Sequence, residues 1–569
     1  MYLLFSATCA YVSVLKALMR VDRANSGHGR GGATGSRRGE FLVGALLICA
    51  VGIVVYGPHV LRGGFAADDW VDYSRYLFHP GSGFWAAVAH HQGIYRPLWA
   101  LISDLGWALM GANPVPHLLQ NLVVALVESI LLFAVARNLG VSLVAAVAMG
   151  LLLLLFPDAD STRLFPTDVQ VALASALFLG GLLVGLRGAN TPGSRGMVLG
   201  LLALLLYTLS ILDYELTAPT ALLAGALCIL RAWRRGTGWL AWSGLLAVEC
   251  VVVGLLLLHR AAGHAPDTTL QQDLAHAAVI ARQAVVVTER AAVPFPVVTL
   301  RSLLFPLALA VVLLATAVAA LARGRTLRPL PQRDLAGLIL GLAVVVTGYV
   351  MIIPGASGYM PDSAGMQNRV NAVAAIGLAV AVVSLISLTA TLLIGWLPWR
   401  RPAASILVLL AAGWVVAGDT LRTSQHAAHW EQAAREQSEV LAILDRAVPP
   451  PRDGLTVFAF ARSGYTAPAV PIFGGGGMGD MVGALRVTWM NGTTRGYPVL
   501  DQMHVDCQPV SILVDGILDS RTHYGRAVFV DLRRGTATVP ADAKECRSAA
   551  DAALPYAPVN ETELSDLGS

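Results

Sequence analysis

The chain has 569 residues, of which 56 % are hydrophobic and only 13 % are charged, and its formal net charge is +4. Soluble domains carry about 25 % charged residues, so this composition excludes an ordinary water-soluble enzyme and favours a membrane protein. The net charge is small and the sequence holds no nucleic-acid-binding motif, so we expect no nucleic acid among its partners.

Apolar runs long enough to cross a ~30 Å hydrocarbon layer recur along the chain. The backbone must satisfy its own hydrogen bonds inside such a layer, so we expect each run to be a helix. The expected spans are residues 41–59, 117–136, 138–156, 169–186, 196–212, 216–230, 239–258, 297–322, 335–353, 371–396 and 403–418. This pattern predicts an all-α polytopic membrane protein with about 11 transmembrane helices. A further apolar stretch at residues 3–19 lacks the charged start of a signal peptide, and its role stays open.

The arginines are concentrated in alternate connections between these spans, beginning with residues 20–40. Positive residues accumulate in cytoplasmic loops, so we expect the N-terminal segment 1–40 to be cytoplasmic and the first long loop, residues 60–116, to lie outside. An odd number of spans then places the chain after Gly418 outside as well. The bias towards Ala, Leu, Val, Arg and Gly is typical of bacteria, so the expected location is the bacterial inner membrane.

The tail, residues 421–569, is expected to be a small extracytoplasmic α+β domain that follows a membrane core at 41–420. It opens with a polar helical stretch, Gln425–Arg446, and continues with β-like runs at Leu455–Ala461, Val510–Val514 and Ala527–Leu532. Cys507 and Cys546 are the two cysteines of the tail, and an outside compartment is oxidising, so we predict that they form a disulfide.

The first outer loop is the segment most suggestive of a functional site. Asp68, Asp69 and Asp72 lie within a stretch of five residues shortly after the first span. A Tyr95-Arg96-Pro97-Leu98 segment comes later in the loop, and the next span opens with His117-Leu118-Leu119-Gln120-Asn121. A long loop that gathers carboxylates, histidines and aromatic residues at the membrane surface is typical of a binding or catalytic site.

The order of these features resembles the GT-C superfamily of integral membrane glycosyltransferases, in particular the protein O-mannosyltransferase and aminoarabinose transferase type. The resemblance covers roughly residues 41–230. It implies an enzyme that moves a sugar from a polyprenyl-phosphate donor to a cell-envelope glycan, lipid or protein acceptor on the outer face. In the superfamily an acidic residue of the first loop acts as general base. That role falls on Asp68 or Asp69, and we prefer Asp68.

A departing phosphate needs cationic partners, and Arg96 is the first candidate, followed by Arg163 and Arg369. The family often has a Lys-Glu pair at the third outer turn, where this sequence has Tyr214-Glu215. The remaining candidates for the site are Asp72, His90, His91 and Glu215. No cofactor is expected with certainty. A divalent cation stays open, and Asp68 and Asp69 would be its ligands.

Two functions of other classes fit the same sequence. A transporter or flippase of an envelope lipid would use charges deep between broken spans, and several spans contain Gly or Pro. A non-catalytic membrane scaffold would bind a partner through the tail, with the acidic residues an ordinary solvated loop. Arg96 would then contact lipid headgroups, and His90 and His91 would lie on a surface helix.

Overall fold

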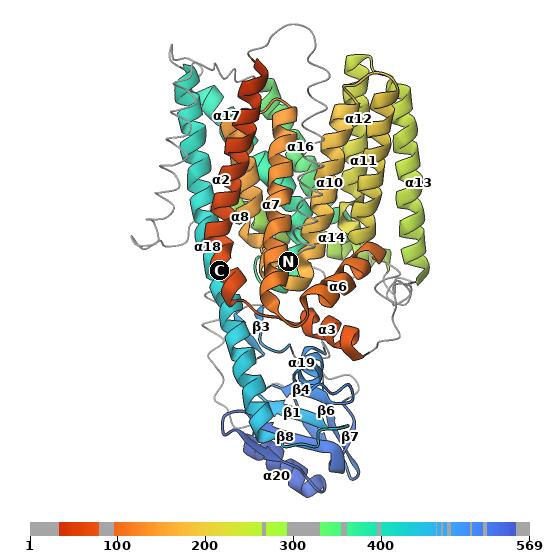
Figure 1. Ribbon diagram of the computed structural model, residues 1–569, viewed down its shortest axis with the longest axis vertical. Helices are drawn as coiled ribbons and strands as arrows, with labels where there is room; N and C mark the ends of the chain where they lie inside the picture. Colours follow the sequence, from red (N-terminus) through yellow and green to blue (C-terminus); the bar gives the residue numbers. More distant parts are fainter. Residues whose placement is uncertain are drawn as a thin grey trace.

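The computed structural model describes residues 33–78, 96–263, 269–292, 331–353, 361–394, 400–461, 464–467, 470–474, 479–500, 503–515 and 520–553. A bundle of long helices carries an α/β domain at one end (Figure 1). Within the described residues, nine helices are long and apolar enough to cross a membrane, and two shorter apolar helices accompany them. The chain is therefore a multi-pass, largely helical membrane protein.

The bundle follows the predicted spans in order. Its helices are α2 (Ala33–Arg62), α7 (Pro114–Asn138), α8 (Leu143–Leu155), α10 (Val169–Gly188), α11 (Ser194–Asp213), α12 (Ala218–Arg235), α13 (Trp239–Gly263), α16 (Pro331–Val350), α17 (Ala372–Ile394) and α18 (Arg400–Ala447). Each predicted span corresponds to one of these helices except 297–322, which lies outside the described residues.

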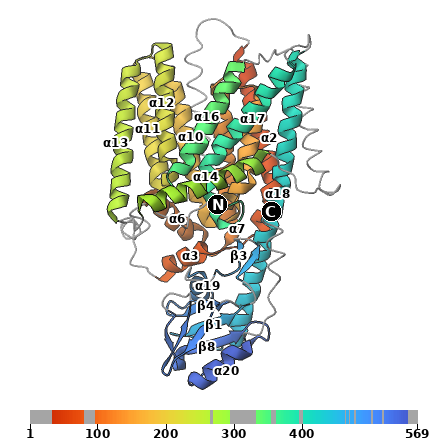
Figure 2. The ribbon, with the colours of Figure 1, turned by 180° about the vertical axis from the view of Figure 1, so that it is seen from behind.

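In the membrane region, three helices of ten or more residues were not predicted as separate elements: α3 (Asp68–Phe78) and α6 (Pro97–Met110) in the first outer loop, and α14 (Leu270–Ala292). Figure 2 shows α14 lying obliquely across the bundle rather than along it. Its sequence mixes Gln, Asp and Arg with apolar residues and so gives no apolar run of membrane-spanning length.

Helix α18 joins the membrane region to the α/β domain without a break. It has 48 residues and runs down one side of the bundle into the domain (Figure 1). The boundary that we expected at residue 420 falls inside it, because no proline interrupts the sequence from Ala403 to Val448. The helix ends just before Pro449-Pro450-Pro451, as expected from the steric restriction that proline imposes on the preceding residue.

The α/β domain is built on a four-stranded sheet in the order β4-β1-β8-β9, in which β4 and β8 both run parallel to β1 and β9 antiparallel to β8. These strands are β1 (Thr456–Phe460), β4 (Arg495–Val499), β8 (Ala527–Asp531) and β9 (Thr536–Thr538). The end of α18 and α19 (Asp480–Trp489) pack on one face, and α20 (Ala543–Ala553) packs on the other. Every residue of β1 is buried, as expected for a strand covered on both faces.

Smaller strands complete the domain: β2 (Tyr465–Ala467), β3 (Val470–Pro471), β5 (Val505–Cys507), β6 (Ser511–Val514) and β7 (Thr522–His523). Strands β2 and β3 pair with each other, and β5, β6 and β7 form an antiparallel sheet. The three runs predicted as strands are therefore confirmed as β1, β6 and β8.

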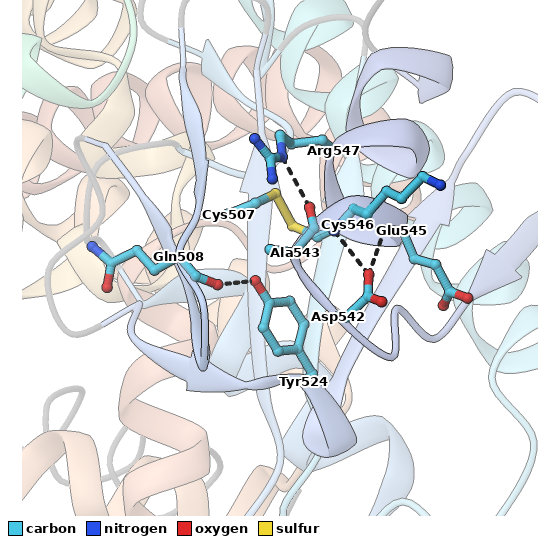
Figure 3. Close-up of a disulfide and its surroundings, with 9 residues drawn as sticks. Cys507, Gln508, Tyr524, Asp542, Ala543, Glu545, Cys546 and Arg547 are labelled. Carbon is cyan, nitrogen blue, oxygen red and sulfur yellow. Dashed lines mark hydrogen bonds between the residues drawn. A yellow bond between two sulfur atoms is a disulfide. The ribbon is translucent and has the colours of Figure 1, made fainter.

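The predicted disulfide is confirmed. It joins Cys507 at the end of β5 to Cys546 in α20, with their Cα atoms 5.9 Å apart (Figure 3). The carboxylate of Asp542 caps α20 by accepting backbone N–H groups at 2.8 and 2.9 Å. The Tyr524 hydroxyl donates to the carbonyl of Gln508, next to Cys507. The disulfide therefore fastens α20 to the small antiparallel sheet.

The first outer loop is docked against the α/β domain through α3 and α19, which lie side by side (Figures 1 and 2). The two backbones approach so closely that a Cβ added at Gly483 would lie 2.3 Å from the carbonyl oxygen of Trp70. The Trp70 indole also donates to Gln437 of α18 at 3.3 Å. The loop that carries the acidic residues is therefore held by both the domain and the long helix.

We predict that Gly483→Leu separates α3 from α19. No side chain fits at this contact, and overpacking a close interface costs about 1–3 kcal/mol. Hydrogen exchange of the α3 amides should become faster, while exchange in α7 and α10 stays unchanged. The control is Gly525→Leu in the same domain, where an added Cβ meets no atom within 4 Å. Unchanged exchange in α3 of the Gly483→Leu protein would contradict the docking described here.

Candidate active site

The predicted outer connections meet at the end of the bundle that carries the α/β domain (Figure 1). They form short helical turns: η1 (Pro157–Ala159), α9 (Ser161–Leu164), η2 (Pro166–Asp168), η3 (Glu215–Thr217) and η4 (Met366–Asn371). Pro157 and Pro166 each open a turn, where the fixed φ of proline suits the first helical position and its missing N–H costs nothing. This layer of turns faces α3.

Asp69 fixes the first loop to this layer. Its side chain is 0 % exposed, and one oxygen accepts the N–H of Ala66 at 2.8 Å. The other oxygen accepts both the N–H of Thr167, at 2.8 Å, and its hydroxyl. Burial raises the pKa of Asp69 well above its usual range, although these hydrogen bonds act in the opposite direction. Both oxygens are engaged within the protein, so Asp69 is a structural anchor.

Asp68, the residue immediately before Asp69, keeps its carboxylate accessible. Its side chain is 44 % exposed, and its Oδ2 lies 3.8 Å from Nη1 of Arg369. The same nitrogen donates to the fully buried Asp168 at 2.9 Å, so the guanidinium is held in place. Ala67, just before Asp68, has a φ of +34°, a strained conformation for a residue with a Cβ. Such strain gathers at functional sites, where the surroundings enforce it.

Two further carboxyl groups interact electrostatically with Asp68. Asp72 follows one turn later on α3 and is paired with Arg75 at 2.9 Å, and its burial raises its pKa to about 7. Asp480 begins α19 and accepts backbone N–H groups at 2.6 and 2.7 Å. Burial raises the pKa of Asp480 to about 7 as well, and the charge of Asp68 contributes to both shifts. The α/β domain therefore supplies a carboxyl group to the surroundings of Asp68.

A second centre forms around Arg96. Its guanidinium donates to both oxygens of Glu215, from Nε at 2.9 Å and from Nη2 at 2.7 Å, and stacks 4.2 Å above the ring of Tyr214. Such two-point pairs fix the plane of a guanidinium. Two predicted site residues that are 119 positions apart are thus brought together. Arg96 thus places a positive charge beside Glu215.

A cavity of about 30 Å³ lies between the two centres, lined by Thr167 on the Asp69 side and Asp213 on the Arg96 side. Trp99, Trp107, His117 and Gln170 are among its other lining residues. Asp213 is fully buried, and neither of its oxygens has a hydrogen-bond partner among the described residues. The volume suits one or two water molecules, which would satisfy this carboxylate.

The position of Arg163 differs from our expectation that it is a partner of the departing phosphate. It is nearly fully buried and donates to the carbonyls of Ala159 at 2.9 Å and Leu153 at 2.6 Å, with Glu128 3.8 Å away. Leu153 lies in the last turn of α8, whose carbonyl groups have no partner within the helix. Arg163 thus turns inward to satisfy the end of α8, and the structure does not bring it to Asp68.

The remaining candidates are placed as follows. His90, His91 and Tyr95 lie outside the described residues. No group of three or more His, Cys, Asp or Glu is arranged for a metal ion in the part of the chain that the structure describes. Asp68 and Asp69, considered above as ligands of a divalent cation, point to different surroundings, since both oxygens of Asp69 accept hydrogen bonds from the protein.

A buried polar network behind the site was not predicted. Asp160 is fully buried, and its carboxylate contacts His426 of α18 at 2.7 Å and Asn368 of η4 at 2.8 Å. Asn368 also accepts the N–H of Ser161 at 3.1 Å. These bonds tie η4, and with it Arg369, to α9 and α18. The polar triplet Gln367-Asn368-Arg369 was the one signal of this network in the sequence.

No protein-family model matches the sequence, and no curated protein matches it. Solved structures that are similar to the chain include two of ArnT from Cupriavidus metallidurans. The structure bound to undecaprenyl phosphate is 15 % identical, with 74 % of this chain and 82 % of that chain covered and a TM-score of 0.33. The apo structure is 18 % identical, with 72 % and 81 % covered and the same TM-score.

We predict that Asp69→Asn destabilises the protein while Asp68→Asn does not. An asparagine at position 69 would turn an NH₂ group towards backbone N–H donors, which costs about 1–3 kcal/mol in a buried site. Asp68 is half-exposed, so its substitution should change the free energy of unfolding by less than about 0.5 kcal/mol. Thermal unfolding in detergent measures both. Equal losses of stability would contradict the division of roles between the two aspartates.

We also predict that the α/β domain loses stability as the pH rises. Asp480 has a pKa of about 7 when folded and about 3.9 when unfolded, so between these values the folded state binds more protons. The free energy of unfolding therefore falls as the pH rises from about 4 to about 7, and above pH 7 Asp480 no longer contributes this stabilisation. Chemical unfolding followed by the fluorescence of Trp489 on α19 tests this. Asp480→Asn should make the free energy of unfolding less dependent on pH, and the exposed Asp551→Asn should leave the pH dependence unchanged. Equal pH dependence in the wild type and both variants would refute the raised pKa of Asp480.

Proposed function

We propose that the chain is a GT-C-type membrane glycosyltransferase that moves a sugar from a polyprenyl-phosphate donor to a hydroxyl of an envelope acceptor. The observation that carries this proposal is the accessible carboxylate of Asp68, held 3.8 Å from the anchored guanidinium of Arg369 at the membrane-facing end of the outer loop. The order of motifs along residues 41–230 supports the same reaction class. The outer face of the bacterial inner membrane is the proposed location, with the α/β domain outside.

In this proposal Asp68 acts as the general base. It accepts the proton of the acceptor hydroxyl as that oxygen bonds to the anomeric carbon of the sugar. The bond between the anomeric carbon and the phosphate oxygen breaks, and its electron pair leaves with the polyprenyl phosphate. Direct displacement of this kind inverts the configuration at the sugar. Asp69 takes no part in proton transfer, because it is enclosed and bonded.

Arg369 and Arg96 are the proposed partners of the donor phosphate. Each guanidinium is oriented by a carboxylate, Asp168 in one case and Glu215 in the other. Donors fixed in advance stabilise charge that develops on a leaving group without a cost of reorganisation. A phosphate on Arg369 would hold the sugar beside Asp68. Arg163, which is turned inward, is left out of the site, while Asp72 and Glu215 position other residues.

A lipid transporter is the second candidate, and one observation favours it. Asp419 lies on α18 inside the bundle and is 1 % exposed, and its Oδ1 has no hydrogen-bond partner among the described residues. Carboxyl groups at such depth are typical of transport pathways. The transferase proposal leaves this residue without a catalytic role, so both functions are included in the test.

The test uses the purified full chain in liposomes with labelled polyprenyl-phosphate sugars and an envelope extract as acceptor. We predict that Asp68→Asn lowers the transfer rate by about 10²- to 10⁴-fold, the usual contribution of a general base. Asp551→Asn, an exposed substitution on α20, is the matched control and should transfer normally. The melting temperature of each variant shows whether the fold is intact.

Two results would overturn the transferase proposal. Asp68→Asn with an intact fold and full activity would remove the base. A wild-type protein that transfers sugar from none of the donors, but moves a fluorescent polyprenyl lipid across the liposome bilayer, would instead establish the transporter. Loss of that movement on Asp419→Asn would then locate the pathway.

A further inference from the structure

A large cavity is bordered by arginines at the end of the bundle away from the α/β domain. Its volume is about 1120 Å³, and α7, α8, α10, α12, α16 and α17 contribute to its walls. Along α12 it extends from Arg235 to Thr220, a distance of roughly 22 Å at 1.5 Å per residue. This corresponds to about two thirds of a ~30 Å hydrocarbon layer. Of the described residues, it shares none with the candidate active site.

The interior of the cavity is largely apolar. Its wall includes Leu132, Met149, Phe178, Leu182, Leu227 and Val380. The wall also carries hydroxyl groups, among them those of Thr220 and Ser384, but its charged side chains are confined to the mouth. The interior therefore suits a hydrocarbon chain.

The mouth of the cavity is basic, and its arginines converge from three helices. Arg137 of α7, Arg231 of α12 and Arg333 of α16 all surround the turn at residues 138–141. Arg137 and Arg231 donate to carbonyl oxygens at the two ends of this turn, at 2.6 and 3.4 Å. Arg333 Nη1 would lie 3.2 Å from a Cβ added at Gly140, whose φ of +87° also favours glycine. The turn thus gathers three guanidinium groups at one point.

Acidic residues do not balance this charge. Arg234 and Arg235 extend the basic mouth, and Asp334 is the one carboxylate among the described lining residues. Asp334 accepts a hydrogen bond from Ser387 at 3.0 Å. Arg137 pairs with Glu40 at 2.6 Å, a residue outside the lining. Five arginines are therefore accompanied by two carboxylates, Asp334 in the lining and Glu40 beside it, which leaves a net positive mouth above a largely apolar interior.

We propose that this cavity binds an anionic phospholipid of the cytoplasmic leaflet, with its phosphate at the arginines and an acyl chain in the interior. Basic pockets between transmembrane helices on the cytoplasmic side bind anionic headgroups, and arginine binds phosphate through two parallel hydrogen bonds. The assignment rests on the proposed orientation, in which the α/β domain lies outside. It does not depend on the transferase activity, because the cavity and Asp68 are at opposite ends of the bundle.

The experiment titrates the full chain in neutral detergent with phosphatidylglycerol or phosphatidylcholine, and native mass spectrometry counts the bound lipid. Phosphatidylglycerol should bind more tightly. Arg333→Gln and the pair Arg234→Gln with Arg235→Gln should weaken it by about fivefold for each arginine lost, the factor that corresponds to ~1 kcal/mol. The matched control is Arg195→Gln, an exposed arginine at the same end that does not line the cavity.

A second pair of variants tests the apolar interior. Leu227→Trp fills the cavity and should also weaken binding by at least about fivefold, the same factor as one arginine. Ala226→Trp, on the neighbouring and exposed position of α12, should leave binding unchanged. These variants separate a lipid inside the cavity from one attracted to the surface charge alone.

Three results would overturn the proposal. The first is equal binding of the two lipids. The second is an Arg195→Gln protein that loses as much affinity as Arg333→Gln, which would indicate general surface attraction. The third uses a photoreactive amino acid at position 227. Crosslinking to phosphatidylglycerol supports the proposal, whereas crosslinking to a peptide from residues 297–322 would show that this segment of the chain fills the cavity.

Discussion

The hydrogen bonds of Asp69 are the constraint on which the outer site depends. A buried carboxylate is costly unless its oxygens are satisfied, and this one accepts from Ala66 at one oxygen and from Thr167 at the other. The contact closes the start of α3 onto the turn at η2, 98 residues further along the chain. Because Asp69 points inward, the preceding side chain of Asp68 must point elsewhere, and the strained φ of Ala67 completes that change of direction. The adjacent aspartates therefore serve opposite purposes, one as anchor and one as exposed acid.

The α/β domain holds the first outer loop on the side opposite to the turn at η2. Helix α18 connects membrane and domain without a flexible linker, and its Gln437 holds Trp70 while also donating to the carbonyl of Ile472. The glycine at position 483 lets α19 approach the backbone of α3 directly. A loop fixed on both faces loses little further entropy when a substrate binds, which is how a rigid scaffold positions reacting groups. Asp480 at the start of α19 makes the domain a contributor to the electrostatic surroundings of Asp68.

The sequence predicted those features that depend on composition and local pattern. Hydropathy located the ten bundle helices that follow the predicted spans, β-branched and aromatic runs located β1, β6 and β8, and the two tail cysteines predicted their own pairing. The site was located only as a neighbourhood. Two adjacent acids look alike in a sequence, yet successive residues at the start of a helix point about 100° apart, and tertiary contacts decide which one is buried. The same limit explains Arg163, whose inward direction follows from unsatisfied carbonyls of α8, and Asp480, whose relevance depends on the docking of α19. A change from apolar to polar residues was interpreted as a domain boundary, so the continuity of α18 was missed. Such a change in polarity does not by itself end a helix.

The arginines of this chain show how charge balance separates two kinds of phosphate chemistry. At the outer end, Arg96 and Arg369 each face a carboxylate, Glu215 and Asp168, that fixes the guanidinium and offsets its charge. A phosphate that must be bound and then released suits such a centre, because the carboxylate partner replaces it when it leaves. At the opposite end, five arginines border one cavity and only two carboxylates accompany them, Asp334 in the lining and Glu40 beside it, while the largely apolar wall suits a hydrocarbon chain. Excess positive charge combined with an apolar interior favours a ligand that stays bound. In the two proposals, the same residue type would support turnover on one side of the membrane and stable lipid attachment on the other, and the ratio of arginines to carboxylates makes the difference.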